Sequence, residues 1–346
     1  MNKNNIENKE SILEISRIGF QWEMGNPFIF CAHHNDAFPK GNKNQGPDVS
    51  LRGRNIGSDF SNKDGFSMYH GDIVPGFPMH PHRGFETVTI VLKGIIDHFD
   101  SLKAHGRYSN GDVQWLTTGK GCQHCEMFPL VNQDKDNPLE LFQVWLNLPK
   151  KDKFCEPNYK MLWAEDIPVF DVVDENNDKT TIKLISGSFE GRVGLEPTPN
   201  SWAFDKNNKV GIVLINMNPN AKLTIPKGTK TMSRNLYFYQ GEGSIEIENK
   251  NIPSSNRIRL NAEFETQITN KDKESFILLL GGERIDEPVV QYGPFVMNTQ
   301  EEIYQAIQDY RETEFGGWHW DRTDPVHPIS SGRFATYIDG KEEVRN

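Results

Sequence analysis

The chain has 346 residues, of which 36% are hydrophobic and 25% charged, and its formal net charge is −10. This length suits a globular protein of one large or two ordinary domains. An acidic surface repels phosphate backbones, which argues against direct nucleic-acid binding but not against a basic protein partner. The chain shows neither an apolar run of about 18 residues nor a secretory h-region, so we expect no membrane partner and a cytoplasmic location. Four cysteines are too few for a disulfide scaffold.

Most of the chain reads as β-structure. Short β-branched and aromatic runs alternate with Gly, Asn and Asp turns, as in residues 86–94, 140–148, 211–217, 235–243 and 275–282. Regular spacing of this kind predicts an all-β fold of sandwiches or barrels. The segments "VTIVLKGIIDHF" and "LYFYQGEGSIEI" echo each other, each with a strand, a Gly turn and a strand. We expect a hairpin in each of two similar halves.

Two histidine pairs stand out in the first half. "HPHRGFETVTIVLKG" begins with His80 and His82, separated by a proline that is a poor choice within a sheet. "GDVQWLTTGKGCQHCEMF" carries His124 and Glu126. Residues i and i+2 of a strand share a face, so two neighbouring strands would aim three imidazoles and one carboxylate at one point. Such a set suits Fe(II), Mn(II), Ni(II) or Cu(II) and leaves open positions for substrate and O₂ or water.

Glu86 competes with Glu126 for the fourth position. It follows His82 by four residues, so an unbroken strand would also point it inward, and parity alone leaves the choice open. "CQHC" (residues 122–125) resembles half a zinc knuckle, but the other two cysteines supply no second pair. Parity directs Cys125 away from His124. Histidines without a partner at ligand spacing are expected in turns or at the surface; these are His33, His34, His70, His98 and His105.

The second half contrasts with the first, because no histidine occurs between residues 125 and 318. A polar, turn-rich stretch near residues 165–180 suggests a boundary, giving a metal-binding domain over 1–170 and a second domain over 171–346 without a metal site. The second domain is expected to be structural or to bind a partner. It would include one helix over 298–312 and an aromatic-rich tail, expected as a strap with no target that the sequence assigns.

The predicted helix has a complete start signal and a packing face. Thr299 and Glu302 form a capping box. The apolar stripe that follows has the spacing of a packed amphipathic helix and consists of Ile303, Ala306, Ile307 and Tyr310.

Long segments closely resemble the pirin family. They are "GFPMHPHRGFETVTIVLKGIIDHFDS", "GDVQWLTTGKGCQHCEM", "LFQVWLNLPKKDKFCEPNYKML" and "EPVVQYGPFVMNTQEEIYQAIQDYR". The resemblance covers about residues 65–165 and 287–312. It implies a bicupin, with two face-to-face β-barrels of the cupin superfamily and one iron in the N-terminal barrel. Its implied ligands are His80, His82, His124 and Glu126, which leaves Glu86 as a nearby group that could steer a ligand histidine.

The resemblance also implies two functions. The first is a quercetin 2,3-dioxygenase-like enzyme, in which a metal ion, most readily Fe(II) but also Mn, Ni, Cu, Co or Zn, serves the opening of a flavonol-like ring by O₂. Glu126 would be both ligand and base for the proton of a small planar aromatic substrate. The alternative is an iron-dependent redox-sensing regulator that binds a protein partner such as a transcription factor.

Several residues beside the ligand strands are candidates for substrate contacts. Bulky side chains that could line a pocket for a planar aromatic molecule are Phe85, Trp115, Met127 and Trp145. Arg83 follows the second histidine directly and could bind an anionic substrate or a nearby carboxylate.

Overall fold

The computed structural model describes residues 10–19 and 21–346, and these form mainly β-strands, as expected. Their contacts divide them into two compact units. The histidine unit comprises residues 30–166, 197–204 and 285–346. The aliphatic unit comprises the described residues up to 29, together with 167–196 and 205–284. The predicted division at residue 170 differs from this grouping, because the helix and the tail lie in the histidine unit.

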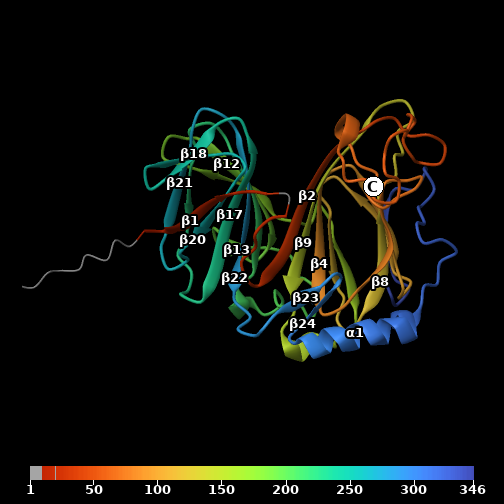
Figure 1. The fold of residues 1–346 in the computed structure, drawn as a ribbon. Coiled ribbons are helices and arrows are strands. Elements are labelled where there is room, and N and C mark those ends of the chain that lie inside the picture. The colour runs from red at the N-terminus through yellow and green to blue at the C-terminus, as the bar shows by residue number, and fades with distance from the viewer. Residues whose placement is uncertain (1–9, 20) are drawn as a thin grey trace, which may run out of the picture. The chain divides into compact units, whose positions relative to one another are not determined.

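Two sheets face each other in the histidine unit, and Figure 1 shows β2, β9, β4 and β8 among their strands. The five-stranded sheet has the order β10 (Asn158–Leu162), β7 (Val113–Thr117), β4 (Phe85–Lys93), β9 (Asn137–Asn147) and β2 (Phe28–Phe38). The six-stranded sheet has the order β26 (Glu342–Arg345), β25 (Arg333–Thr336), β6 (His105–Ser109), β5 (Ile95–Asp100), β8 (Cys122–Met127) and β3 (Gly76–His82). Side chains meet between the sheets, since the Thr89 hydroxyl of β4 donates to Glu126 of β8 at 2.7 Å.

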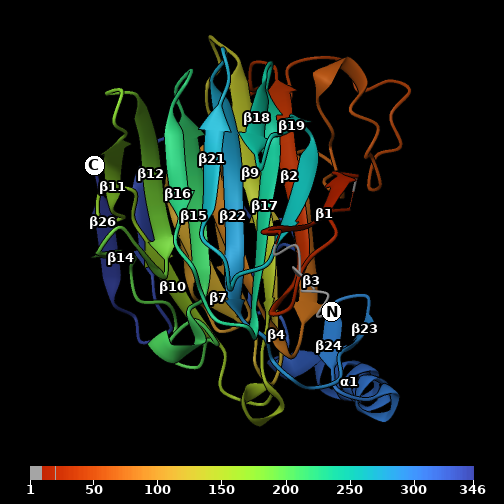
Figure 2. The ribbon, with the colours of Figure 1, turned by 90° about the vertical axis from the view of Figure 1, so that its left-hand side faces the viewer.

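The aliphatic unit also contains two larger sheets, and Figure 2 shows several of their strands side by side. The seven-stranded sheet has the order β1 (Ile12–Arg17), β20 (Asn256–Leu260), β17 (Met232–Gly241), β22 (Ser275–Glu283), β15 (Gly211–Met217), β12 (Lys179–Ser186) and β11 (Val169–Val173). The four-stranded sheet has the order β16 (Lys222–Ile225), β21 (Thr266–Asn270), β18 (Ser244–Ile247) and β19 (Lys250–Pro253). A short ribbon joins β13 (Ser188–Phe189) and β14 (Arg192–Val193). The buried hydrophobic core of this unit consists of aliphatic side chains together with Phe and Met.

The two echoing segments form strand–turn–strand units, but the predicted hairpins are wrong. β4 pairs with β7 and β9, whereas β5 pairs with β6 and β8, so the chain crosses between sheets at Gly94. Gly94 has a φ of +90°, which a residue with a Cβ rarely adopts. In the second half β17 and β18 likewise lie in different sheets. The repeated sequence pattern therefore marks a turn at which the chain passes from one sheet to the other, and each unit has one such turn.

The predicted helix is confirmed as α1 (Gln300–Thr313), which crosses one end of the strands in this unit (Figure 1). Its capping box is complete, and Ile303 and Ala306 are buried. Arg83 binds a nearby carboxylate, one of its two proposed roles, by donating to Asp309 of α1 at 2.6 Å. Beside the helix, β23 (Val290–Tyr292) pairs with β24 (Phe295–Met297). The short 3₁₀ helices are Lys63–Gly65, Lys150–Asp152, Lys206–Asn208 and Glu314–Gly316.

The tail has a definite target. β25 pairs with β6, so the tail extends the six-stranded sheet. Arg107 of β6 forms a two-pronged ion pair with Asp97, at 2.7 and 2.8 Å, and donates to the Pro328, Ser331 and His327 carbonyls. No helix among the described residues is long and apolar enough to cross a membrane.

Candidate metal centre

Three histidines converge between the sheets of the histidine unit. β3 and β8 are antiparallel neighbours, and His80 lies directly opposite His124, which confirms that the two pairs occupy adjacent strands. The nearest ring nitrogens of His80, His82 and His124 all lie within 4.8 Å of one another. His82 and His124 are buried, and His80 is half-buried. The i, i+2 spacing on β3 and the register with β8 together produce this cluster.

The ring nitrogens of this cluster fit a metal ion. His80 Nδ1 lies 2.8 Å from the Pro78 carbonyl, which can only accept, so Nδ1 carries the proton and Nε2 keeps its lone pair. Among the described residues, no group hydrogen-bonds His82 Nδ1 or either ring nitrogen of His124, although all three nitrogens are buried. Burial lowers the pKa of each of the three histidines, which favours the neutral imidazole that ligates metals. Orphaned buried nitrogens are costly, and a bound cation would satisfy one nitrogen of each imidazole.

Glu126 lies beside the three histidines but outside the group of mutually close donor atoms. Its Oε2 lies 3.9 Å from His124 Nε2 and accepts a hydrogen bond from Gln143 Nε2 at 2.9 Å. Its Oε1 accepts from the Thr89 hydroxyl at 2.7 Å and from Tyr108 at 3.4 Å. Burial raises the pKa of this carboxyl. The position suits a fourth ligand or a proton acceptor.

Glu86 points away from the cluster. β3 ends at His82 and β4 begins at Phe85, so the alternation of faces does not continue from one strand to the other. The Glu86 carboxylate accepts from Trp115 Nε1 at 3.0 Å and from hydroxyls of Thr117, Thr198 and Ser201. Burial raises its pKa to about 7. These contacts do not support the expectation that Glu86 steers a ligand histidine.

The expectation of turn or surface positions holds for His70, which is exposed in a turn, and is wrong for His98. His98 of β5 is completely buried and lies opposite Glu126. Its ring stacks on Tyr159 at 4.9 Å, and its Nε2 lies 3.3 Å from Asp100 Oδ2. The i, i+2 spacing of His98 and Asp100 was the available signal. The remaining three occupy strands and are half-buried, namely His33, His34 and His105.

The proposed pocket residues divide between the two faces of the sheets. The Phe85 and Trp145 rings lie 5.0 and 5.4 Å from the His82 ring. Trp115 instead binds Glu86, and Met127 packs with Cys125 in a cluster that the tail tryptophans adjoin. Cys125 therefore lies on the face opposite the histidines, as parity predicted. The zinc-knuckle alternative gains no support, because the three-histidine group contains no cysteine.

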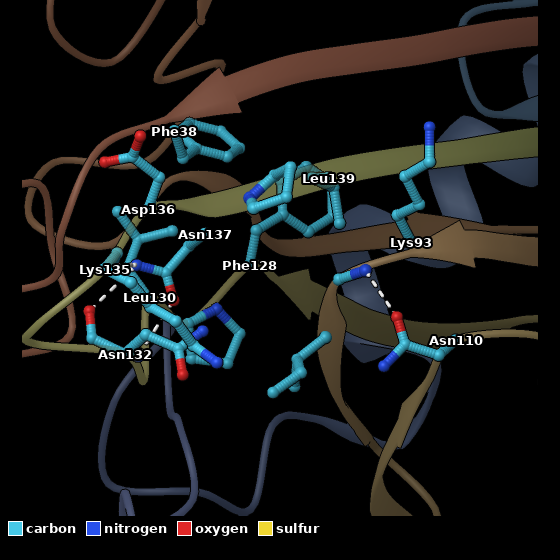
Figure 3. A pocket seen from close by; sticks show the side chains of 14 residues that line it. Phe38, Lys93, Asn110, Phe128, Leu130, Asn132, Lys135, Asp136, Asn137 and Leu139 are labelled. Atoms are coloured by element: carbon cyan, nitrogen blue, oxygen red, sulfur yellow. Dashed lines mark hydrogen bonds between the residues drawn. The ribbon is translucent and has the colours of Figure 1, made fainter.

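A separate cavity of about 430 Å³ also lies in the histidine unit (Figure 3). Its apolar wall includes Phe38, Phe128 and Leu139, and Lys93 and Lys135 also line it. None of the three clustered histidines lines this cavity, so it is distinct from the candidate metal centre.

Comparison with known proteins gives the family. The Pirin family model matches residues 17–146, and the model of the Pirin C-terminal cupin domain matches residues 212–316. A pirin-like protein of Solanum lycopersicum is 35% identical over 275 residues, which cover 78% of this chain and 88% of that protein. A Pseudomonas aeruginosa protein provisionally named quercetin 2,3-dioxygenase is 35% identical over 248 residues, covering 70% of this chain and 80% of the relative.

The fold agrees with this assignment. A crystal structure of quercetin 2,3-dioxygenase from Acinetobacter baumannii superposes with a TM-score of 0.68 at 23% identity and covers 90% of this chain and 99% of that chain. The two cupin domains expected from the sequence are therefore present. The chain belongs to the pirin family.

Proposed function

We propose that this chain is a metal-dependent dioxygenase that resembles quercetin 2,3-dioxygenase. It would open the heterocycle of a flavonol-like aromatic molecule, consuming one O₂ and releasing carbon monoxide. The observation that carries the proposal is the convergence of three buried or half-buried imidazoles beside two aromatic rings. The provisional name of the Pseudomonas relative supports the same reaction class.

His80, His82 and His124 would hold the metal, with Glu126 as the fourth ligand. Three imidazoles and one carboxylate accept Fe(II), Mn, Ni, Cu, Co or Zn. We assign Fe(II) because the family resemblance implies iron. When bound, the metal supplies Lewis-acid and one-electron chemistry at open coordination positions.

The remaining chemistry belongs to the side chains. Glu126 takes the proton of the substrate hydroxyl, and Thr89 and Gln143 hold its carboxylate in place by hydrogen bonds of 2.7 and 2.9 Å. Phe85 and Trp145 form an apolar wall beside His82 against which a planar ring can lie. The Trp145 indole N–H is buried without a hydrogen-bond partner among the described residues, so it can donate to a polar atom of the substrate.

The test is O₂ uptake and carbon monoxide release by protein loaded anaerobically with Fe(II) and given quercetin. His124→Ala should abolish both signals. The matched control is His33→Ala, because the His33 ring stacks on Phe142 and its Nε2 contacts Glu140 rather than the three-histidine cluster. One bound iron per chain without O₂ uptake would refute the dioxygenase proposal and favour an iron-dependent binding role.

A further inference from the structure

A hydrogen-bonded triad of His34, Tyr69 and Asp36 lies in the histidine unit, separate from the candidate metal ligands. Tyr69 donates its hydroxyl to Asp36 Oδ2 at 2.7 Å, and the same hydroxyl lies 2.8 Å from His34 Nδ1. Asp36 and His34 are two residues apart on β2 and therefore share a face, whereas Tyr69 comes from the loop before β3. Asp36 and Tyr69 are buried, and His34 is half-buried.

The hydrogen bonds of this triad all point toward Asp36, so the donor and the acceptor of each bond can be assigned. The Asp36 carboxylate accepts at both oxygens, from the Ser67 amide at 2.9 Å and from the Tyr69 hydroxyl. Because the single hydroxyl proton of Tyr69 goes to Asp36, its oxygen accepts from His34 Nδ1–H. His34 is thereby held in the tautomer whose Nε2 carries a lone pair. The His34 Nε2 atom can therefore accept a hydrogen bond from a donor group that does not belong to the triad.

The loop holds Tyr69 in an unusual backbone conformation. Tyr69 has a φ of +58°, in the left-handed region that aromatic residues rarely adopt. Two backbone hydrogen bonds of 2.8 Å with Asp59 hold it there, and Asp59 is itself paired with Arg54 at 2.9 Å. Strained backbone that is held so firmly is typical of functional positions. The conformation delivers the Tyr69 hydroxyl to His34.

His34 borders the candidate metal centre. Phe30, on the same face of β2, lies 4.7 Å from the Trp145 ring, and that ring lies beside His82. The His34 ring is 5.7 Å from Phe77, which in turn is 6.5 Å from His80. The Phe77 ring thus lies between His34 and His80, and a flat polycyclic molecule bound beside this ring would reach from one histidine to the other.

We propose that His34 Nε2 accepts a hydrogen bond from a phenolic hydroxyl of the substrate, at the end remote from the metal. The inference rests on the proposed function. It narrows the class of substrates to molecules that carry a second hydroxyl besides the one directed at the metal. A neutral imidazole acceptor selects a hydroxyl donor over an anion. Tyr69 and Asp36 are positioning residues that fix the tautomer of His34.

The test compares two flavonols on Fe(II)-loaded protein. Quercetin carries additional ring hydroxyls, whereas 3-hydroxyflavone keeps only the hydroxyl directed at the metal. Binding is measured anaerobically by quenching of tryptophan fluorescence, and KM and kcat are measured in air. Tyr69→Phe keeps the ring and removes only the hydroxyl, and His34→Leu removes the acceptor. His33→Leu is the matched control on the other face of β2.

The expected result is a loss of roughly fivefold in quercetin affinity, seen in Kd and KM, for Tyr69→Phe and His34→Leu, because one net hydrogen bond is lost. Binding of 3-hydroxyflavone should not change, and His33→Leu should match the wild type with both ligands. Equal effects on both flavonols, or no effect on either, would overturn the inference. Quercetin binding with this discrimination but without turnover would refute the dioxygenase alone. A wild-type protein that binds neither flavonol would refute both proposals.

Discussion

Replacing Arg107 by methionine tests how the tail is fastened to the six-stranded sheet. The Arg107 and Asp97 side chains are 2% and 0% exposed, and their two contacts measure 2.7 and 2.8 Å. Removing one member of a buried pair leaves the other charge uncompensated and costs about 3–5 kcal/mol. Among the described residues, the Asp97 side chain then keeps only the His327 amide as a hydrogen-bond donor, at 2.8 Å. We therefore expect Arg107→Met to lower the free energy of unfolding of the histidine unit by about 4 kcal/mol.

The assay is urea unfolding followed by tryptophan fluorescence, together with limited proteolysis of the tail. Cleavage after residue 320 should accelerate, because three tail carbonyls lose their donor. Lys120→Met is the matched control, since it breaks an exposed pair with Glu156 and should cost less than about 1 kcal/mol. Asp97→Asn in the Arg107→Met background should recover part of the loss. Equal stability of Arg107→Met and Lys120→Met would refute the reasoning.

Three further outcomes are expected. Gly84→Ala should lower the free energy of unfolding by roughly 3 kcal/mol, because φ is +87° and the added Cβ would lie 2.1 Å from the Val296 carbonyl oxygen. Gly191→Ala, which also has a positive φ but has open space around the added Cβ, should lower it by about 1 kcal/mol in the same denaturant titration. Burial lowers the pKa of His327 from 6.5 to about 3, so its stabilising contribution is present above pH 6.5 and falls by up to about 1.4 kcal/mol per pH unit as the pH drops toward 3. His327→Gln should flatten the fall in unfolding free energy between pH 6 and pH 4, and an unchanged slope would contradict this. Fe(II) at 100 times its Kd should stabilise the wild type by about 2.7 kcal/mol and leave His80→Ala unchanged in thermal unfolding.

Alternation within single strands was the most reliable guide from the sequence. It placed His80 and His82 on one face and Cys125 on the face opposite His124, because each pair lies inside one unbroken strand. It could not place Glu86, because the break between β3 and β4 resets the alternation. Parity is therefore a statement about one strand and cannot be carried across a turn.

Contacts between segments that are distant in the chain could not be predicted from the sequence. Tyr69 reaches His34 from a long loop, and no local pattern records that its backbone is left-handed. The tail read only as a strap, since its partner β6 lies more than 200 residues earlier in the chain. The crossing at Gly94 looked like a hairpin because a strand, a glycine turn and a strand have the same local signature in both arrangements.

The helix α1 and the tail pack against the outer face of β8, and these contacts help to offset the cost of the polar side chains on its inner face. Buried ring nitrogens without a partner each cost about 1–3 kcal/mol, and β8 carries two of them on His124. Its opposite face is apolar at Cys125 and Met127, and the tail tryptophans pack against that cluster. Gln123, also on that face, is bound by the Tyr310 hydroxyl of α1. The aliphatic unit needs no comparable cover, because its core fills the space between its sheets with apolar side chains. The helix and the tail thus stabilise β8, one of the two strands whose inner side chains are held ready for a ligand.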